Sequence, residues 1–148
     1  MKVKDFVCMC AGVVGGVVNW LFGGYTIAME CLVICMAIDY ICGLVVAGLF
    51  HKSKKSEKGG LSSKEGWKGL ARKCLTLGLL VIAYRLDCII GKAYVKDTLT
   101  IAFIVNECLS IIENAGLMGL PMPKVLTNAI DILNKKVNGE DKTTDTSN

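Results

Sequence analysis

The stretch MECLVICMAIDYICGLVVAGLFHKSKK, residues 29–55, decides how this chain folds. It is apolar almost throughout up to Phe50, it contains the acids Glu30 and Asp39, and a run of lysines follows it. A helix that is apolar on all sides belongs in a protein core or in lipid, because a solvated helix shows a polar face. The stretch also has the roughly 17–25 residues that a spanning helix needs. It therefore predicts a membrane helix that ends at a basic boundary.

The rest of the chain shows the same separation of apolar and charged residues. Of the 148 residues 53% are apolar, and the charged ones gather between long apolar runs. We expect an all-α membrane protein whose transmembrane domain, residues 1–120, has about four spans, at 6–22, 27–50, 74–91 and 98–120. If one segment does not cross, three spans remain. A cleaved signal peptide is the alternative for the first segment, but no small-x-small cleavage site follows it.

The connections predict the topology. The first two apolar segments are joined by only GGYT, which predicts an antiparallel hairpin. The loop 51–73 carries eight Lys or Arg against two Glu, so the positive-inside rule places it in the cytoplasm. Its cations would contact lipid headgroups rather than nucleic acid, because they lie beside apolar runs and no nucleic-acid motif accompanies the net charge of +4. The candidates for these headgroup contacts are Lys52, Lys54, Lys55, Lys58, Arg72 and Lys73.

The C-terminal part has a different pattern. Leu126, Ile130, Leu133 and Val137 repeat at helical spacing, which predicts an amphipathic helix within 121–138 at the membrane surface or against a partner. Residues 139–148 are small and polar, and we expect them to be disordered.

The cysteines do not indicate a metal site. Eight are present, but there is no Cys-x-x-Cys pair and His51 is the single histidine. Metal ligation therefore lacks its usual spacing, and cysteine in apolar runs behaves as a small hydrophobe. No nucleophile–base set or phosphate loop is apparent in the sequence either. We expect no metal, no cofactor and no enzymatic activity.

Two charged residues within the spans invite a pairing hypothesis. Asp39 lies eleven residues before Phe50, and Arg85 lies eleven residues after Cys74. At about 1.5 Å per residue both would be roughly 16 Å inside the membrane. We therefore predict an Asp39–Arg85 ion pair between the second and third spans. In the alternative, Arg85 extends toward the far interface beside Asp87.

The fourth apolar segment is unusually polar for a span. Asn106, Ser110 and Glu113 form one stripe at helical spacing, and Glu107 and Asn114 form a second on the adjacent face. Such a helix packs inside an assembly or lines an aqueous path, and the sequence leaves both open. Small residues at a spacing of four also favour close helix packing, namely Gly12 with Gly16 and Gly43 with Ala47.

Three linked blocks resemble a known family. AIDYICGLVVAG, SSKEGWKGLARKCLTLGLLVIAYRLD and FIVNECLSIIENAGLMGLPMPKVL, within residues 30–128, are similar in order and spacing to the phage lysis and toxin-secretion holins. The resemblance implies a small multi-pass protein of the bacterial cytoplasmic membrane. Such proteins form homo-oligomers in the lipid bilayer and open holes that release a peptidoglycan hydrolase or a toxin, without required direct contact with it. Family members are often drawn with three spans, and the family has no catalytic residues.

Two other functions stay open at this point. A small four-helix transporter of the multidrug-efflux type tends to have an essential Glu in the middle of its first helix, and none is present at 6–22. A membrane scaffold would recruit soluble partners through the basic loop and would leave the membrane potential intact.

Overall fold

The computed structural model describes residues 3–51 and 63–138. In these two ranges every regular element is a helix, with no strand, which confirms the predicted all-α class. The five helices are α1 (Val3–Phe22), α2 (Ile27–Gly48), α3 (Ser63–Ile90), α4 (Val95–Leu117) and α5 (Lys124–Asn138).

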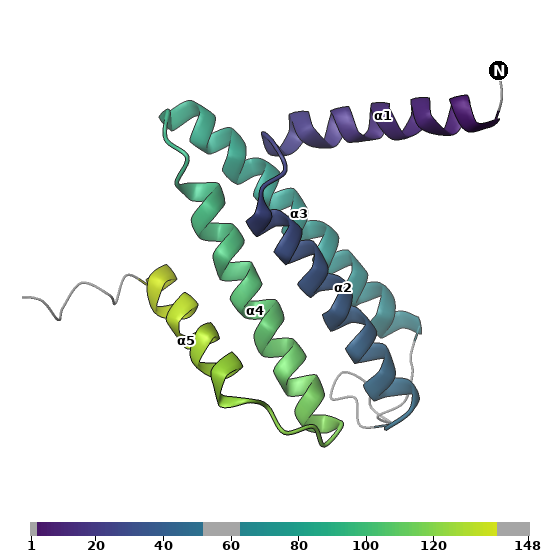
Figure 1. Cartoon of the computed structure of the whole chain (residues 1–148), viewed down its shortest axis with the longest axis vertical. Helices are drawn as coiled ribbons and strands as arrows, with labels where there is room; N and C mark the ends of the chain where they lie inside the picture. Colours follow the sequence, from purple (N-terminus) through teal and green to yellow (C-terminus); the bar gives the residue numbers. More distant parts are fainter. Residues whose placement is uncertain (1–2, 52–62, 139–148) are drawn as a thin grey trace, which may run out of the picture.

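Three helices form a bundle, and the other two are attached to it. α2, α3 and α4 lie side by side, with α3 running opposite to the other two (Figure 1). α4 is central, since it contacts α2, α3 and α5. Among the described helices α1 packs mainly against α3, and it crosses one end of the bundle.

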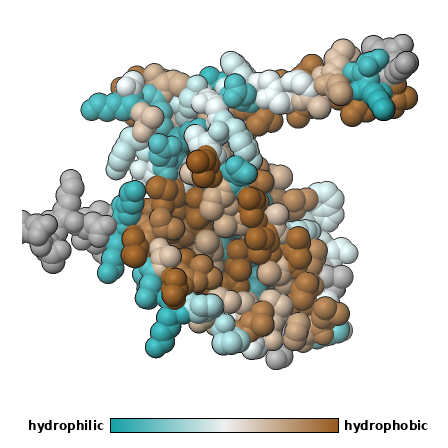
Figure 2. All heavy atoms as spheres, viewed as in Figure 1, coloured by the Kyte–Doolittle hydropathy of each residue, from teal (hydrophilic) through white to brown (hydrophobic). Residues whose placement is uncertain are grey.

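The core of the bundle is small and apolar. Met29, Leu32 and Met36 from α2 meet Leu80 of α3 and Ile104 of α4. Outside this core, large apolar side chains are exposed, and Figure 2 shows them gathered over the bundle while hydrophilic residues lie along its edges. Such a surface is suited to lipid rather than to water.

Two helices, α1 and α2, are long and apolar enough to cross a membrane by length and composition. α1 buries none of its residues in the chain. α3 carries Arg85 and Asp87, and α4 carries Glu107 and Glu113, so both are less apolar than α2. The count of four spans therefore stays a prediction.

The predicted hairpin of the first two segments is wrong. α1 and α2 do not pack together, because the connection turns α1 away from the bundle. Gly23 and Gly24 have φ angles of 67° and 105°, which side chains other than glycine rarely adopt. Gly23 also lies so close to Tyr84 that a Cβ would come within 2.0 Å of its ring. The sequence showed a short connection, but not its direction.

The predicted loop 51–73 is wrong from residue 63 onward. α3 begins at Ser63, so residues 63–73 of the expected loop are helical. The sequence shows no apolar helical period in residues 63–73, because this part of the helix is polar and mostly exposed. Residues 52–62, which include Lys52, Lys54, Lys55 and Lys58, lie outside the described residues, as do residues 139–148.

Candidate functional site: a buried ion cluster beside a polar groove

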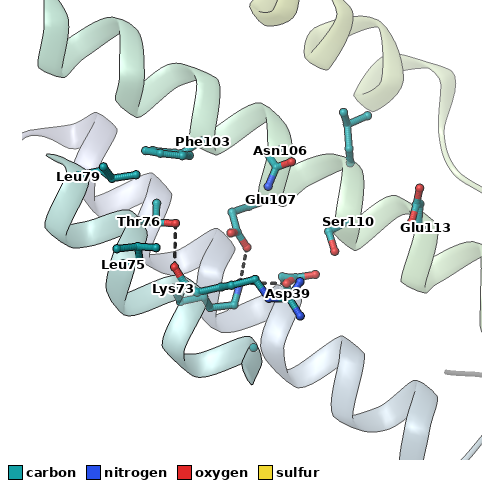
Figure 3. A pocket seen from close by; sticks show the side chains of 13 residues that line it. Asp39, Lys73, Leu75, Thr76, Leu79, Phe103, Asn106, Glu107, Ser110 and Glu113 are labelled. Atoms are coloured by element: carbon teal, nitrogen blue, oxygen red, sulfur yellow. Dashed lines mark hydrogen bonds and ion pairs between the residues drawn. The ribbon is translucent and has the colours of Figure 1, made fainter. Parts of the chain in front are cut away.

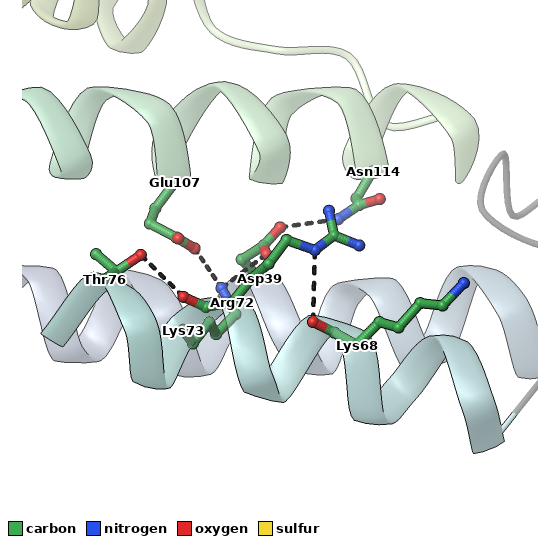
Figure 4. Close-up of polar contacts among 7 residues, drawn as sticks. All are labelled: Asp39, Lys68, Arg72, Lys73, Thr76, Glu107 and Asn114. Carbon is green, nitrogen blue, oxygen red and sulfur yellow. Dashed lines mark hydrogen bonds and ion pairs between the residues drawn. The ribbon is translucent and has the colours of Figure 1, made fainter. Parts of the chain in front are cut away.

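One lysine joins the three bundle helices. Lys73 of α3 donates to Asp39 Oδ2 of α2 at 2.9 Å and to Glu107 Oε2 of α4 (Figure 4). The three side chains are only 15%, 11% and 10% exposed. We call Asp39, Lys73 and Glu107 the ion cluster. Its formal charge is −1, because two carboxylates face one ammonium group.

A fourth polar residue completes the cluster's hydrogen bonding. Asn114 of α4 donates from Nδ2 to Asp39 Oδ1 at 3.1 Å. Across the described residues, no buried side-chain nitrogen or oxygen lacks a hydrogen-bond partner. Charges can be kept among apolar helices only when they are paired in this way.

The predicted Asp39–Arg85 pair is wrong, and the helix start explains why. Because α3 begins eleven residues earlier than expected, Lys73, not Arg85, lies at the level of Asp39. Lys73 was expected at the lipid headgroups, and that expectation is corrected as well. Arg85 is three turns further along α3, at the end of the bundle that α1 crosses.

A cavity of about 530 Å³ opens beside the ion cluster, between α3 and α4 (Figure 3). We call it the α3–α4 groove. Its lining mixes charged, polar and apolar side chains, with the ion cluster along one part of it. From α3 come Arg72, Leu75, Thr76 and Leu79, and from α4 come Phe103, Asn106, Leu109, Ser110 and Glu113.

The two polar stripes of α4 point in different directions. Asn106, Ser110 and Glu113 line the groove, and Asn106 and Glu113 are exposed. Glu107 and Asn114 instead turn inward to the ion cluster. Four of the five residues therefore line the groove, and Glu107 belongs to the groove and to the ion cluster.

Arg72 and Glu113 lie on opposite rims of the groove. Arg72 is exposed, and its Nε donates to the Lys68 carbonyl at 3.4 Å. Neither residue has an ion pair within the part of the chain that the structure describes. One turn earlier, Lys68 pairs with Glu65 at 2.7 Å, and this hydrogen bond lowers the pKa of the Glu65 carboxyl.

A second polar group holds the end of α1. Lys96 Nζ donates to the Phe22 carbonyl at 2.6 Å, and Arg85 donates to the Trp20 carbonyl at 3.4 Å. The guanidinium also lies 4.4 Å from the centre of the Trp20 ring. Two cations thus meet the C-terminal carbonyls of α1, where the helix dipole is negative. We call these contacts the α1 joint.

Asp87 fixes the turn between α3 and α4. Its carboxylate accepts the backbone N–H groups of Tyr94, Val95 and Lys96, at 3.1, 2.7 and 2.8 Å. These are N–H groups at the start of α4 that have no partner inside the helix. Asp87 therefore has a structural role that places Lys96 at the α1 joint. Sequence reasoning missed the role of Lys96, because it is a single lysine beside a short connection and no pattern marks it.

The small residues differ in their surroundings. A Cβ added at Gly12, Gly16 or Gly43 would meet nothing within 4 Å, whereas Ala47 is buried. The close packing expected at the three glycines therefore does not occur among residues 3–51 and 63–138, and packing against another copy stays a prediction.

The cysteines are free thiols among the described residues. The Sγ atoms of Cys35 on α2 and Cys108 on α4 lie 4.0 Å apart. No group of three His, Cys, Asp or Glu side chains in residues 3–51 and 63–138 could hold a metal ion.

Comparison with known proteins gives a family match over most of the chain. The bacteriophage holin family matches residues 16–135. An uncharacterised protein of Halalkalibacterium halodurans is 36% identical over 83% of this chain and 90% of its own length. One from Clostridium perfringens is 32% identical over 89% of this chain and 95% of its own length.

A phage protein among the relatives carries a functional name. A probable holin of Bacillus phage phi105 is 30% identical over 71% of this chain and 73% of its own length. No solved structure matches the chain.

Proposed function

We propose that this chain, which belongs to the bacteriophage holin family, assembles in the bacterial cytoplasmic membrane and opens holes there. The holes would release a peptidoglycan hydrolase or a toxin. The family match and the phage relative support a holin, and the two apolar helices support a membrane location. A holin is a membrane protein that does not act as an enzyme.

The observation that carries this proposal is the α3–α4 groove beside the ion cluster. A charged side chain at the centre of a membrane costs about 2.5–3.5 kcal/mol. Asn106 and Glu113 are exposed on the groove, and Asp39, Lys73 and Glu107 lie along it. In a bilayer this side of the bundle must therefore face protein or water.

An assembly that first clusters and then opens a hole meets this requirement, first with protein and then with water. While copies accumulate, each groove is covered by protein, so the membrane stays sealed. When the copies rearrange, the grooves turn to a water-filled lumen and the apolar outer side stays in lipid. The ion cluster lets Asp39 and Glu107 persist in both arrangements, because Lys73 offsets their charge.

The test is inducible expression in a bacterial host with a co-expressed cytoplasmic peptidoglycan hydrolase. A dye follows the membrane potential, and turbidity follows lysis. We expect a sudden loss of potential, with lysis only when the hydrolase is present. A sustained potential and normal growth, at confirmed membrane expression, would overturn the proposal.

A matched pair of variants tests the role of the groove. Asn106→Leu makes the groove more apolar, and Asn128→Leu makes the same change on an exposed position of α5. We expect Asn106→Leu to delay or abolish lysis and Asn128→Leu to leave its timing unchanged. Equal timing for both variants would show that the groove does not face the lumen.

A further inference from the structure

We propose that the α3–α4 groove binds the same groove of a second copy through two reciprocal ion pairs, Arg72 with Glu113 of the partner copy and Glu113 with its Arg72. This names the contact surface of the sealed assembly, and it rests on the proposed function. The inference follows from the depth, the charge and the lining of the groove.

Arg72 and Glu113 lie near the same level of the bundle. Arg72 is the neighbour of Lys73, and Glu113 is the neighbour of Asn114. Lys73 and Asn114 bind the two oxygens of the same carboxylate, that of Asp39. The two rim charges therefore lie near the same level of the bundle, within the reach of an arginine side chain, although they stand on different helices.

This shared level matters because copies in a membrane are inserted with the same orientation. Two such copies that pair face to face are related by a two-fold axis along the membrane normal. The axis places α3 of one copy opposite α4 of the other and leaves the depth of every residue unchanged. Arg72 then meets the partner's Glu113, and the symmetry repeats the pair.

A second copy matches the charges of Arg72 and Glu113 better than lipid headgroups or water would. The rims carry one cation and one anion, and neither has an ion pair within the described chain. An anionic lipid headgroup would suit Arg72 but would be repelled by Glu113. Water would solvate both charges but would leave the leucines of the lining exposed to it. A second copy meets both charges and the leucines.

The rest of the groove suits a helix contact in lipid. Thr76, Asn106 and Ser110 can exchange hydrogen bonds across the two-fold axis, which stabilises helix pairs in membranes. Leu75, Leu79 and Leu109 are 65%, 41% and 47% exposed in the single chain, and they would pack against the leucines of the second copy's groove.

Charge exchange tests the pairing. The full chain is purified in density-matched detergent micelles, and its dimer dissociation constant is measured by sedimentation equilibrium. The variants are Arg72→Glu, Glu113→Arg and the double variant. Each single reversal should weaken the dimer by at least about tenfold, since it replaces two attractions with two repulsions. The double variant should restore the wild-type constant within about threefold.

Lys68→Glu is the matched control, because Lys68 is exposed one turn before Arg72 and does not line the groove. It should leave the dissociation constant unchanged. Circular dichroism confirms that each variant keeps its helices. A monomeric wild type, single reversals without effect, or a double variant as weak as the single ones would each overturn the inference.

The lysis assay separates this inference from the proposed function. If the wild type lyses cells but the reversals do not affect the dimer, the inference fails and the proposed function stands. If the dimer responds as expected but no loss of membrane potential occurs, the contact surface stands and the proposed function fails.

Discussion

Lys73 lies between the carboxylates of Asp39 and Glu107, so a single side chain of α3 binds both α2 and α4. The three side chains are largely buried, so the cluster joins the helices away from water. Burial makes each partner necessary, because a charge left alone there would have neither water nor an opposite charge.

Replacing Lys73 by methionine should therefore destabilise the bundle strongly. Lys73→Met keeps the length of the side chain but leaves Asp39 and Glu107 without their cation. We expect the free energy of unfolding to fall by about 3–5 kcal/mol. The measurement is unfolding in mixed micelles, followed by circular dichroism.

Lys68→Met is the control for this substitution. Lys68 is on the same helix, and its side chain is 54% exposed in the pair with Glu65. Exposed pairs contribute little, so its unfolding curve should match the wild type. Equal curves for Lys73→Met and the wild type would show that the ion cluster does not hold the bundle.

The sequence predicted the helical class and the polar side of α4, but not the partners of its charges. Apolar periodicity is a local property, so it identified the apolar segments and the stripe of Asn106, Ser110 and Glu113. The pairing of Asp39 depended on where α3 begins. That start lies in a polar segment with no apolar period. Because the helix begins eleven residues before the expected segment, Lys73 and not Arg85 is the partner of Asp39.

The direction of α1 could not be predicted from the sequence either. A connection of four residues usually joins antiparallel neighbours. Here the contacts that set its direction come from Tyr84, Arg85 and Lys96, which lie more than 60 residues away along the chain. The local sequence shows only that Gly23 and Gly24 permit unusual backbone angles.

Ile130 should attach α5 to the bundle. It is 4% exposed, whereas Ile132 on the same helix is 63% exposed. Ile130→Ala should cost about 2–5 kcal/mol at this contact and release α5 from α4, while Ile132→Ala should cost little. Limited trypsin digestion in micelles reports the release, because Lys124, Lys135 and Lys136 lie on α5. Equal digestion of the two variants would contradict the packing of α5 on α4.

Gly23 should tolerate no side chain. Gly23→Ala combines a φ of 67° with a Cβ that would come within 2.0 Å of the Tyr84 ring. The backbone angle alone costs about 1–2 kcal/mol, and the overlap adds to it. Gly12→Ala is the control, because its Cβ would meet nothing within 4 Å. We expect a lower unfolding midpoint for Gly23→Ala alone. Two equal midpoints would show that the turn does not rest on Tyr84.

The α1 joint should depend on Lys96. Lys96→Met removes the charged donor of the Phe22 carbonyl, and such hydrogen bonds contribute about 1.5–3 kcal/mol. At 1.4 kcal/mol per factor of ten, amide hydrogen exchange in the last turn of α1 should accelerate by about 10- to 150-fold. The measurement is exchange followed by mass spectrometry of peptides that cover residues 19–26.

Lys92→Met is the control for the joint, because Lys92 is exposed in the connection that precedes α4. It should leave the exchange of the last turn of α1 unchanged. Arg85→Gln provides an independent readout in a Trp67→Phe background, where Trp20 is the single tryptophan. Loss of the guanidinium 4.4 Å from the ring should make Trp20 fluorescence easier to quench. If exchange and quenching both stay at wild-type values, the two cations do not hold α1 across the end of the bundle.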